Sequence, residues 1–422
     1  MKKKKIKNVL IFIFLYFFID LTLTQFFLIN FYYKKLESQH IGDSENRISN
    51  RDYKYTFTKK KSFKSIYLGH VFTVKTNNLG FRDSKVRDLD KTNHYTIVIG
   101  DSFVEGNPLE FEDSLVGYLN KKLRNEKINK FEFLNAGVSS YSSYIYQKKI
   151  ISILDNNPWI KTKMVIVLLD KSDVSDDLSY LDKPEFFLHK EKHQFVYKGK
   201  FFDDLRKLYF WNYEIFVTKT YLQNLWRFIY RQTITGIFLK KTSDIIELEA
   251  RNLRDRYKLS KKLEKSFFKI SSKQIKAFRS INTRTYLTKY FYGDLWMLEG
   301  KKSVDFSIEN LMLLKNYLNS KDIKMLVVLY PWAFELADKI PRENYLNYIL
   351  PKLDKKKINY ILAYEHFLSL KNDVYTNITD NYVYNDIHFN KEGYKILSDI
   401  IWEEISNSIT KNKESIQIKV ED

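Results

Sequence analysis

The feature that most constrains the fold of this 422-residue chain is a series of five short apolar runs. Continuous apolar runs of this length suit strands buried on both faces, as in a parallel sheet covered by helices. Helix-like stretches lie between and after them. This alternation predicts a three-layer α/β/α sandwich with a five-stranded, mostly parallel sheet. The runs are Tyr95–Gly100, Phe131–Gly137, Met164–Leu169, Met325–Tyr330 and Ile358–Ala363, and the helical stretches are Asp113–Arg124, Tyr144–Leu154, Ile308–Leu318 and Lys391–Ile405.

A long detour, residues 175–305, separates the third run from the fourth and is rich in aromatic and basic residues. It is too long for a structureless loop in a compact domain, so we expect a mainly helical insertion that caps the strand ends. Two interpretations stay open. It is either a packed helical subdomain, or a lid or membrane-facing platform in which Arg227 and Arg231 lie beside aromatic side chains.

The N-terminus predicts a membrane anchor. A basic tail, residues 1–7, precedes an apolar segment, residues 8–33, whose only charged side chain is Asp20. That length crosses a bilayer, and no small-residue cleavage site follows it. The leading lysines favour a cytoplasmic N-terminus and an outward-facing main domain. Asp20 is either offset by its apolar neighbours or marks a contact with a partner helix.

The remaining boundaries follow from these segments. We expect a juxtamembrane connector at 34–75, near anionic lipid, the main domain at 76–410 and a polar tail at 411–422. The net charge is +20, but the lysines are scattered among acids along the whole chain, so we expect no nucleic-acid partner. There is no cysteine, no phosphate-binding glycine pattern and no metal-ligand spacing of the histidines, so we expect no cofactor and no metal.

The strongest chemical signal is Gly100-Asp-Ser102 at the end of the first apolar run. A serine at the point where a central strand passes into a helix is exposed at the carboxyl edge of the sheet, where α/β folds bind ligands. Backbone N–H groups nearby can receive an oxyanion. The alternative is that Ser102 is a plain helix N-cap.

The second signal is Asp386-Ile-His388, just before the last helix. In an extended segment, residues two apart point to the same side, so both side chains can face the sheet edge. A serine hydroxyl needs an imidazole to take its proton, and the imidazole needs a carboxylate to fix its tautomer. His388 could instead be a plain surface histidine, and His366 is the reserve candidate for the base.

Gly100-Asp-Ser-Phe103, Asn135-Ala-Gly-Val-Ser-Ser140 and Asp386-Ile-His-Phe-Asn390 together resemble the spaced blocks of the SGNH (GDSL) hydrolase family. Thr76-Asn-Asn-Leu-Gly-Phe-Arg-Asp83 resembles a stretch that precedes the nucleophile strand in membrane-anchored members. The resemblance implies a flavodoxin-like sheet order. It also implies Ser102 as nucleophile, Gly137 as a backbone oxyanion donor, His388 as general base and Asp386 as its partner.

The chain departs from the family in two places. The family's oxyanion asparagine after the middle strand is missing, and Asp170-Lys-Ser-Asp173 stands there. Ser172 could donate instead, whereas an ionised Asp170 or Asp173 would repel the oxyanion, and losing one donor costs about 3 to 4 kcal/mol of transition-state stabilisation. The carboxylate stands two residues before the histidine, as in the polysaccharide O-acetylation branch of the family.

The resemblance implies a serine esterase or O-acyltransferase acting on O-acyl groups, expected to be acetyl, of a cell-surface glycan. We expect it in the cytoplasmic membrane with its catalytic domain outside, and a membrane-bound protein is the implied acyl donor. The missing asparagine and Asp20 favour a non-catalytic glycan-binding or scaffold subunit as an alternative. A lipase or thioesterase, with acyl chains bound by the aromatic insertion, is a third interpretation.

Overall fold

The computed structural model describes residues 46–181 and 269–417, except positions 51, 68, 69, 284, 371 and 372, together with scattered positions within 11–19 and 250–262. The chain divides into two compact units. One consists of Met1–Glu45 and Phe195–Ile270, and the other of Asn46–Gln194 and Ser271–Asp422. Every element discussed below belongs to the second unit.

All five predicted strands are confirmed, and they pair in parallel as one side of a larger sheet. Their order is β7-β6-β8-β9-β10, the doubly wound order in which the chain turns back between β6 and β8. The carboxyl ends of strands on either side of such a reversal form the crevice where open α/β sheets bind ligands. The strands are β6 (His94–Ile99), β7 (Phe131–Asn135), β8 (Lys161–Leu169), β9 (Lys324–Leu329) and β10 (Tyr360–Leu362).

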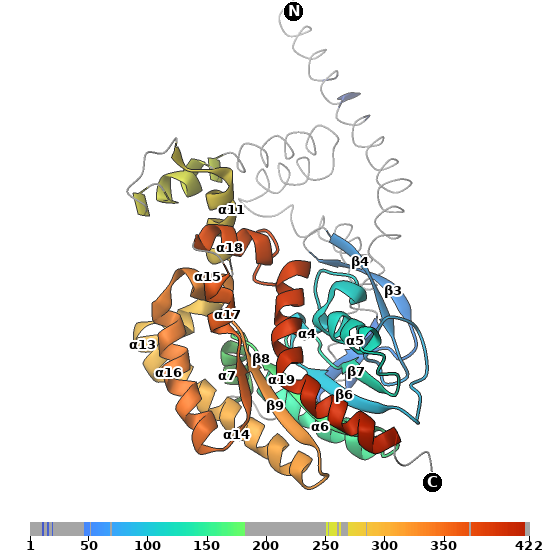
Figure 1. The fold of residues 1–422 in the computed structure, drawn as a ribbon. Helices are drawn as coiled ribbons and strands as arrows, with labels where there is room; N and C mark the ends of the chain where they lie inside the picture. Colours follow the sequence, from blue (N-terminus) through green and yellow to red (C-terminus); the bar gives the residue numbers. More distant parts are fainter. Residues whose placement is uncertain are drawn as a thin grey trace, which may run out of the picture. The chain divides into compact units, whose positions relative to one another are not determined.

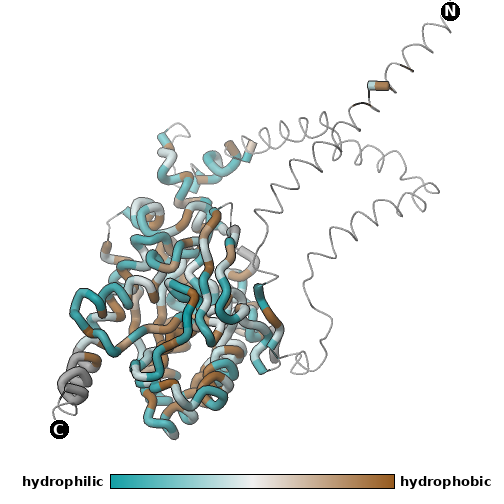
Figure 2. The backbone as a smooth tube through the Cα atoms, turned by 90° about the vertical axis from the view of Figure 1, so that its right-hand side faces the viewer, coloured by the Kyte–Doolittle hydropathy of each residue, from teal (hydrophilic) through white to brown (hydrophobic). Residues whose placement is uncertain are grey.

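Helices cover both faces of these parallel strands, which confirms the three-layer arrangement (Figure 1). One layer packs α5 against α19, and the other packs α14 against α6 and α16. Along the helices, hydrophobic and hydrophilic stretches alternate, as Figure 2 shows, because each helix buries one face on the sheet. The helices are α5 (Leu115–Asn125), α6 (Ser143–Asn156), α14 (Lys301–Asn319), α16 (Lys339–Lys355) and α19 (Lys391–Gln417).

The prediction of five strands is too low, because the sheet has eight. Beyond β7 it continues with three antiparallel strands, and the region that we expected to be a connector supplies two of them. In β4 the buried residues alternate with more exposed ones, which is typical of a strand covered on one face only. The added strands are β5 (Arg82–Asp83), β4 (His70–Thr76) and β3 (Ser62–Tyr67), and a separate hairpin consists of β1 (Arg47–Asn50) and β2 (Lys54–Phe57).

The described ends of the predicted insertion are helical. α7 (Asp173–Leu181) opens it, and α11 (Ser272–Ile281), α12 (Thr285–Thr288), α13 (Gly293–Leu295) and a π-helical turn at Trp296–Gly300 lead into α14. Residues 182–249 lie outside the described part, so the lid or platform interpretation of Arg227 and Arg231 stays a prediction. At the other end of the chain, α19 continues past its predicted end at Ile405 into the segment expected as a tail.

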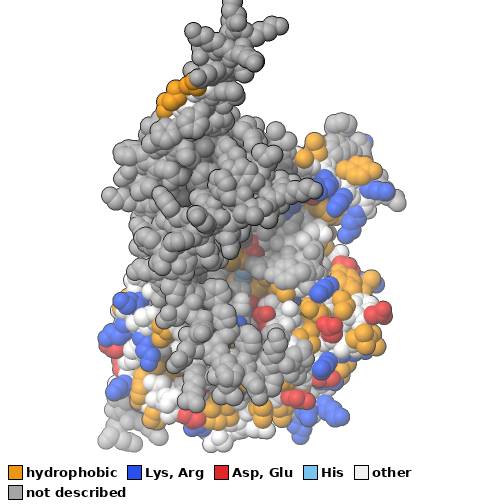
Figure 3. Space-filling model, turned by 180° about the vertical axis from the view of Figure 1, so that it is seen from behind, with side chains coloured by type: hydrophobic (Ala, Val, Ile, Leu, Met, Phe, Trp, Pro, Cys, Tyr) orange, Lys and Arg blue, Asp and Glu red, His pale blue; other side chains and the backbone are white. Residues whose placement is uncertain are grey.

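Among the helices formed by described residues, none combines the length and the apolar character that crossing a bilayer needs. Only positions 11, 15, 16 and 19 of the expected anchor, residues 8–33, are described. The anchor therefore stays a prediction. On the face of the molecule shown in Figure 3, the described basic side chains are interspersed with acidic ones.

Arg82 ties the added strands to the loop that follows β6. Its guanidinium is 1% exposed and donates to the carbonyl oxygens of Glu105 (2.5 Å), Gly106 (3.1 Å) and Leu109. The preceding turn is shaped by Asn77, whose side-chain oxygen accepts the N–H groups of Leu79 and Phe81. The Asn-Asn-Leu-Gly-Phe-Arg stretch thus holds a buried cation behind that loop.

Replacing Arg82 by lysine should destabilise the protein. The ammonium group of lysine cannot replace the planar guanidinium, which donates to three carbonyl groups. Each buried acceptor left without a donor costs about 1 to 3 kcal/mol. We expect urea unfolding of Arg82→Lys to show a loss of about 2 to 4 kcal/mol. Arg124→Lys, at an exposed position on α5, is the matched control and should change stability by less than about 0.5 kcal/mol. Equal stabilities of the two variants would contradict this role.

Candidate active site

Ser102 begins the short helix α4 (Ser102–Glu105) directly after β6 and Gly100. A Cβ on Gly100 would lie 2.4 Å from Cγ2 of Val104 and 3.2 Å from the carbonyl oxygen of Leu168, so only glycine lets the strand pass this closely into the helix. Asp101 caps α4, and its carboxyl accepts the N–H of Phe103 at 2.9 Å. Ser102 is partly exposed at the carboxyl end of β6, where the strand order reverses between β6 and β8.

Asp386 and His388 lie in the loop between α18 (Val374–Asn381) and α19. We expected an extended segment there, and this is wrong, because the loop is a compact turn. Asn385 is left-handed with φ 58°, the Asp386 N–H donates to the Val383 carbonyl at 3.2 Å, and the Val383 N–H donates to the His388 carbonyl at 2.9 Å. The turn nevertheless brings the two side chains together.

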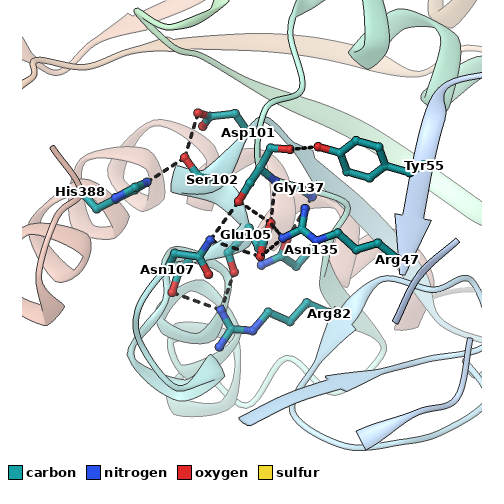
Figure 4. A network of polar contacts seen from close by, with 12 residues as sticks. Arg47, Tyr55, Arg82, Asp101, Ser102, Glu105, Asn107, Asn135, Gly137 and His388 are labelled. Atoms are coloured by element: carbon teal, nitrogen blue, oxygen red, sulfur yellow. Dashed lines mark hydrogen bonds and ion pairs between the residues drawn. The ribbon is translucent and has the colours of Figure 1, made fainter. Parts of the chain in front are cut away.

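The three predicted side chains form one continuous hydrogen-bonded chain. The Oγ of Ser102 lies 2.7 Å from Nε2 of His388 (Figure 4), and Nδ1 of His388 lies 2.5 Å from Oδ2 of Asp386. His388 and Asp386 are 1% and 2% exposed, so water does not compete for the bond between them. With the proton on Nδ1, the imidazole donates to the carboxylate and accepts the serine hydroxyl, which is the arrangement that activates a serine.

Aromatic rings hold the imidazole from two sides. The Phe103 ring centroid lies 4.8 Å from that of His388, and the ring of Tyr67 meets His388 edge-on at 5.3 Å. The Tyr67 hydroxyl also lies 3.4 Å from Oδ1 of Asp386. Tyr67 ends β3, so sequence reasoning missed it when it assigned that region to a connector. The reserve histidine, His366, is exposed on α17 (Tyr364–Ser369).

Both predicted oxyanion donors are bonded within the protein. The Gly137 N–H donates to Oδ1 of Asn135 at 3.1 Å, and the Ser172 hydroxyl donates to Oδ1 of Asp170 at 2.5 Å. Gly137 packs tightly against α4, since a Cβ there would lie 2.5 Å from Cβ of Val104. Their roles as oxyanion donors stay predictions.

Asp170 lies at the carboxyl end of β8 and is surrounded by donors. One oxygen receives the N–H and hydroxyl of Ser172 at 2.7 and 2.5 Å, and the other receives the Tyr330 hydroxyl at 2.6 Å and the Trp332 indole N–H at 2.8 Å. Fixed N–H donors thus reach both of its oxygens, as suits an ionised carboxylate. Asp173 is buried nearby, and burial first, then the charge of Asp170, raises its pKa well above the ordinary value.

A second buried acid, Glu105 at the end of α4, contacts two loops and the strand β1 (Figure 4). It accepts both the N–H and the hydroxyl of Ser139, at 2.5 and 2.8 Å, the side-chain amide of Asn107 at 3.2 Å, and the guanidinium of Arg47 at 2.9 Å. Burial alone would raise the pKa of Glu105, but Arg47 and the Ser139 donors outweigh it and lower this pKa. Sequence reasoning missed this pair, because Arg47 lies in β1, far from Glu105 in the chain.

No protein-family profile matches the sequence, and no curated protein matches it. Solved structures of esterases and acylhydrolases are similar to the chain at a low level. TesA has 10% identity over 74% of this chain and 97% of its own, with a TM-score of 0.36. An acetyl xylan esterase from Geobacillus stearothermophilus has 11% sequence identity over 75% of this chain and 97% of its own, with a TM-score of 0.34. The esterase EstA from Pseudoalteromonas sp. has 9% sequence identity over 75% of this chain and 98% of its own, with a TM-score of 0.33.

The Arg47–Glu105 pair leads to a prediction about how the stability of the fold depends on pH. Because the folded-state pKa of Glu105 is lowered, its ionisation stabilises the fold above the unfolded-state pKa, and this stability is lost as the pH falls through the folded-state value. Glu105→Gln should cost about 3 to 5 kcal/mol at pH 7, because it removes the buried negative charge that pairs with the Arg47 guanidinium. The difference from the native protein should shrink as the pH falls below the ordinary value of 4.5.

Urea unfolding of both proteins at pH 7 and at acid pH measures this difference. Glu126→Gln, at an exposed position after α5, is the control and should change stability by less than about 0.5 kcal/mol at either pH. A Glu105→Gln penalty that is the same at both pH values would contradict the assignment of an ionised Glu105.

Proposed function

We propose that this chain is a serine-dependent ester hydrolase or O-acyltransferase of the SGNH type. The observation that carries the proposal is the hydrogen-bonded chain from Ser102 through His388 to Asp386. The three side chains come from two loops at one edge of the sheet, and Ser102 is the partly exposed member. The proposal rests on this geometry and on the sequence blocks, and not on the distant structural similarities.

In the proposed reaction, Oγ of Ser102 attacks the carbonyl carbon of an ester while its proton passes to Nε2 of His388. The carbonyl electron pair moves onto oxygen and forms a tetrahedral oxyanion. When this collapses, the ester C–O bond breaks and the leaving alcohol takes the proton from His388. Water, or a sugar hydroxyl, then attacks the acyl-enzyme with His388 again as base, and Ser102 is released.

The oxyanion must be held by donors near Ser102. We assign this role to the backbone N–H groups of Ser102 and Gly137, which flank the proposed point of attack. The Gly137 N–H now donates to Asn135, so it must exchange this bond for one to the oxyanion. Such bonds often align only in the transition-state complex.

The proposed substrate is an O-acyl group, preferably acetyl, on a cell-surface glycan. Two features of the sequence support it: the expected N-terminal anchor, which holds the catalytic domain outside the cytoplasmic membrane, and the carboxylate two residues before the histidine, which resembles the polysaccharide O-acetylation branch. A membrane-bound protein is the proposed acyl donor if the reaction is transfer.

One observation favours a second candidate, a non-catalytic glycan-binding or scaffold subunit. Neither Gly137 nor Ser172 offers a donor that is not already bonded within the protein, and the family's asparagine is absent from the loop after β8. A site in which these two donors stay bonded within the protein would bind an ester without cleaving it efficiently. The intact triad weighs against this candidate, because binding alone needs no activated serine.

The serine esterase proposal predicts covalent labelling by a fluorophosphonate. We expect the full-length protein to be labelled and Ser102→Ala not to be. His388→Ala should slow the labelling about 10²- to 10⁴-fold, since it removes the general base. His366→Ala, which alters an exposed histidine on α17, is the matched control and should react at the native rate. Equal labelling of the native protein and Ser102→Ala, measured by gel fluorescence over time, would defeat the proposal.

Surface glycans separate the two candidates. Cells that carry only Ser102→Ala should show the same change in glycan O-acetyl content, measured by mass spectrometry, as cells without the protein. More acetyl in both strains indicates hydrolysis, and less acetyl indicates transfer. A scaffold subunit predicts instead that Ser102→Ala cells resemble the native cells while the deletion strain differs.

A further inference from the structure

Asp101 is a buried carboxyl group in direct contact with the proposed nucleophile. Its side chain is 2% exposed. Oδ1 accepts the Phe103 N–H at 2.9 Å, whereas Oδ2 lies 3.0 Å from Oγ of Ser102 (Figure 4) and 3.3 Å from Oγ of Ser172. Oδ2 therefore lies between two serine hydroxyls, one from the loop after β6 and one from the loop after β8.

The hydrogens of both hydroxyls are already used. Each serine hydroxyl has one hydrogen to donate. In the active triad we assign the Ser102 hydrogen to Nε2 of His388 at 2.7 Å, the shorter of its two contacts. We assign the Ser172 hydrogen to Oδ1 of Asp170, because that contact is 2.5 Å long and the one to Oδ2 of Asp101 is 3.3 Å. Neither serine has a hydrogen left for Oδ2 of Asp101.

We assign the missing hydrogen to Asp101 rather than to Asp170. Each of its oxygens already accepts a fixed N–H, from the Ser172 backbone and from the Trp332 indole, which suits an anion. If Asp101 were also ionised, its Oδ2 would face the lone pairs of two oxygens at 3.0 and 3.3 Å. A proton on Oδ2 removes this conflict, because Oδ2–H can then donate to either hydroxyl oxygen.

The electrostatics of the site agree with this count. Burial first, and then the charge of Asp170, raise the pKa of Asp101 well above the ordinary value of 3.8. A carboxyl group held in an apolar site can stay neutral at pH 7 and act as a hydrogen-bond donor. Among the described residues, the titratable groups that interact with Asp101 directly or through Ser102 are acids, tyrosines and the triad histidine. They are Asp170, Asp173, Tyr146, Tyr330, Tyr394 and His388.

We propose that Asp101 is a neutral carboxylic acid in the working enzyme and that its Oδ2–H donates a hydrogen bond to the oxyanion, in place of the asparagine that the chain lacks. This inference rests on the proposed function. Oδ2 is 3.0 Å from the Oγ that bonds to the substrate carbon, so an oxygen on that carbon comes within its reach. Asp101 keeps its proton throughout, because the Ser102 proton goes to His388.

The inference also accounts for the acids that follow β8. An ionised Asp101 this close to the reacting oxygen would oppose the developing negative charge. Burial first, and then the negative charge of Asp170, favour the protonated form of Asp101 by raising its pKa, and Ser172 links the two carboxyl groups. Asp170, which lies where the family has a donor, thus acts through Asp101 as a positioning residue.

Infrared difference spectroscopy tests the protonation state directly. The probe is the full-length protein in detergent at pH 7, compared with Asp101→Asn. We expect the native protein to show the carbonyl stretch of a protonated carboxylic acid that Asp101→Asn lacks. Other buried acids, such as Asp173, are present in both samples and cancel. A difference spectrum that shows only the loss of an ionised carboxylate would overturn the inference.

Turnover of p-nitrophenyl acetate tests the donor role. Asp101→Ser keeps a helix N-cap but is too short to place a donor at Oδ2, and we expect its kcat to fall about 10²- to 10³-fold. The asparagine in Asp101→Asn can both cap α4 and donate from the Oδ2 position. The kcat of this variant should therefore be at least about tenfold higher than that of Asp101→Ser. The native enzyme should lose activity at alkaline pH as Asp101 ionises, and Asp101→Asn should lack this loss. An equal loss of kcat in both variants would overturn the donor role.

The two proposals can fail separately. In one outcome, the native protein shows the protonated acid band but does not react with a fluorophosphonate. The neutral state of Asp101 is then retained, but the serine esterase proposal and the donor role are both rejected. A protein that is labelled at Ser102 and turns over the ester, but lacks the band, overturns the inference about Asp101 alone.

Discussion

The hydrogen bond from Ser102 to His388 joins two residues that are 286 positions apart in the chain, and the rest of the site is arranged to make it short. Parallel strands place their carboxyl ends at one edge of the sheet, so the loop after β6 and the loop before α19 can meet there. Gly100 lets the first loop turn closely past Leu168, and the left-handed Asn385 lets the second turn inward. The fold thus brings the two loops close together, and two local turns direct the side chains of Ser102 and His388 toward each other.

The N-terminal strands brace each of the loops that the site uses. Arg47 in β1 pairs with Glu105 behind α4, Tyr55 in β2 donates to the carbonyl of Ser139, and Tyr67 in β3 contacts both Asp386 and His388. Arg82 in β5 donates to the carbonyl groups of Glu105 and Gly106 at the end of α4. Since these contacts involve buried groups, each is costly to leave unmade, and together they make the added antiparallel strands a structural part of the catalytic edge.

The sequence was informative where the signal is local. Continuous apolar runs predict strands such as β6 and β8 because both of their faces are covered, and Gly100-Asp-Ser102 and Asp386-Ile-His388 each indicate chemistry within three residues. The alternating pattern of β3 and β4 is weaker, and the connector interpretation overlooked it. The turn at Asn385 could not be predicted, since its left-handed conformation is set by packing. Nor could the proton on Asp101, because it depends on Asp170, Tyr330 and Trp332, which meet only in the folded chain.

The central claim is that Ser102 is a nucleophile activated by His388. A crystal structure of the full-length protein after reaction with a fluorophosphonate tests it most directly, since the adduct mimics the tetrahedral intermediate. The account predicts phosphorus bonded to Oγ of Ser102, Nε2 of His388 within hydrogen-bonding distance of that oxygen or of the leaving-group position, and Asp386 still bonded to Nδ1. Phosphorus on another side chain, or an unmodified Ser102 after prolonged reaction, would contradict it.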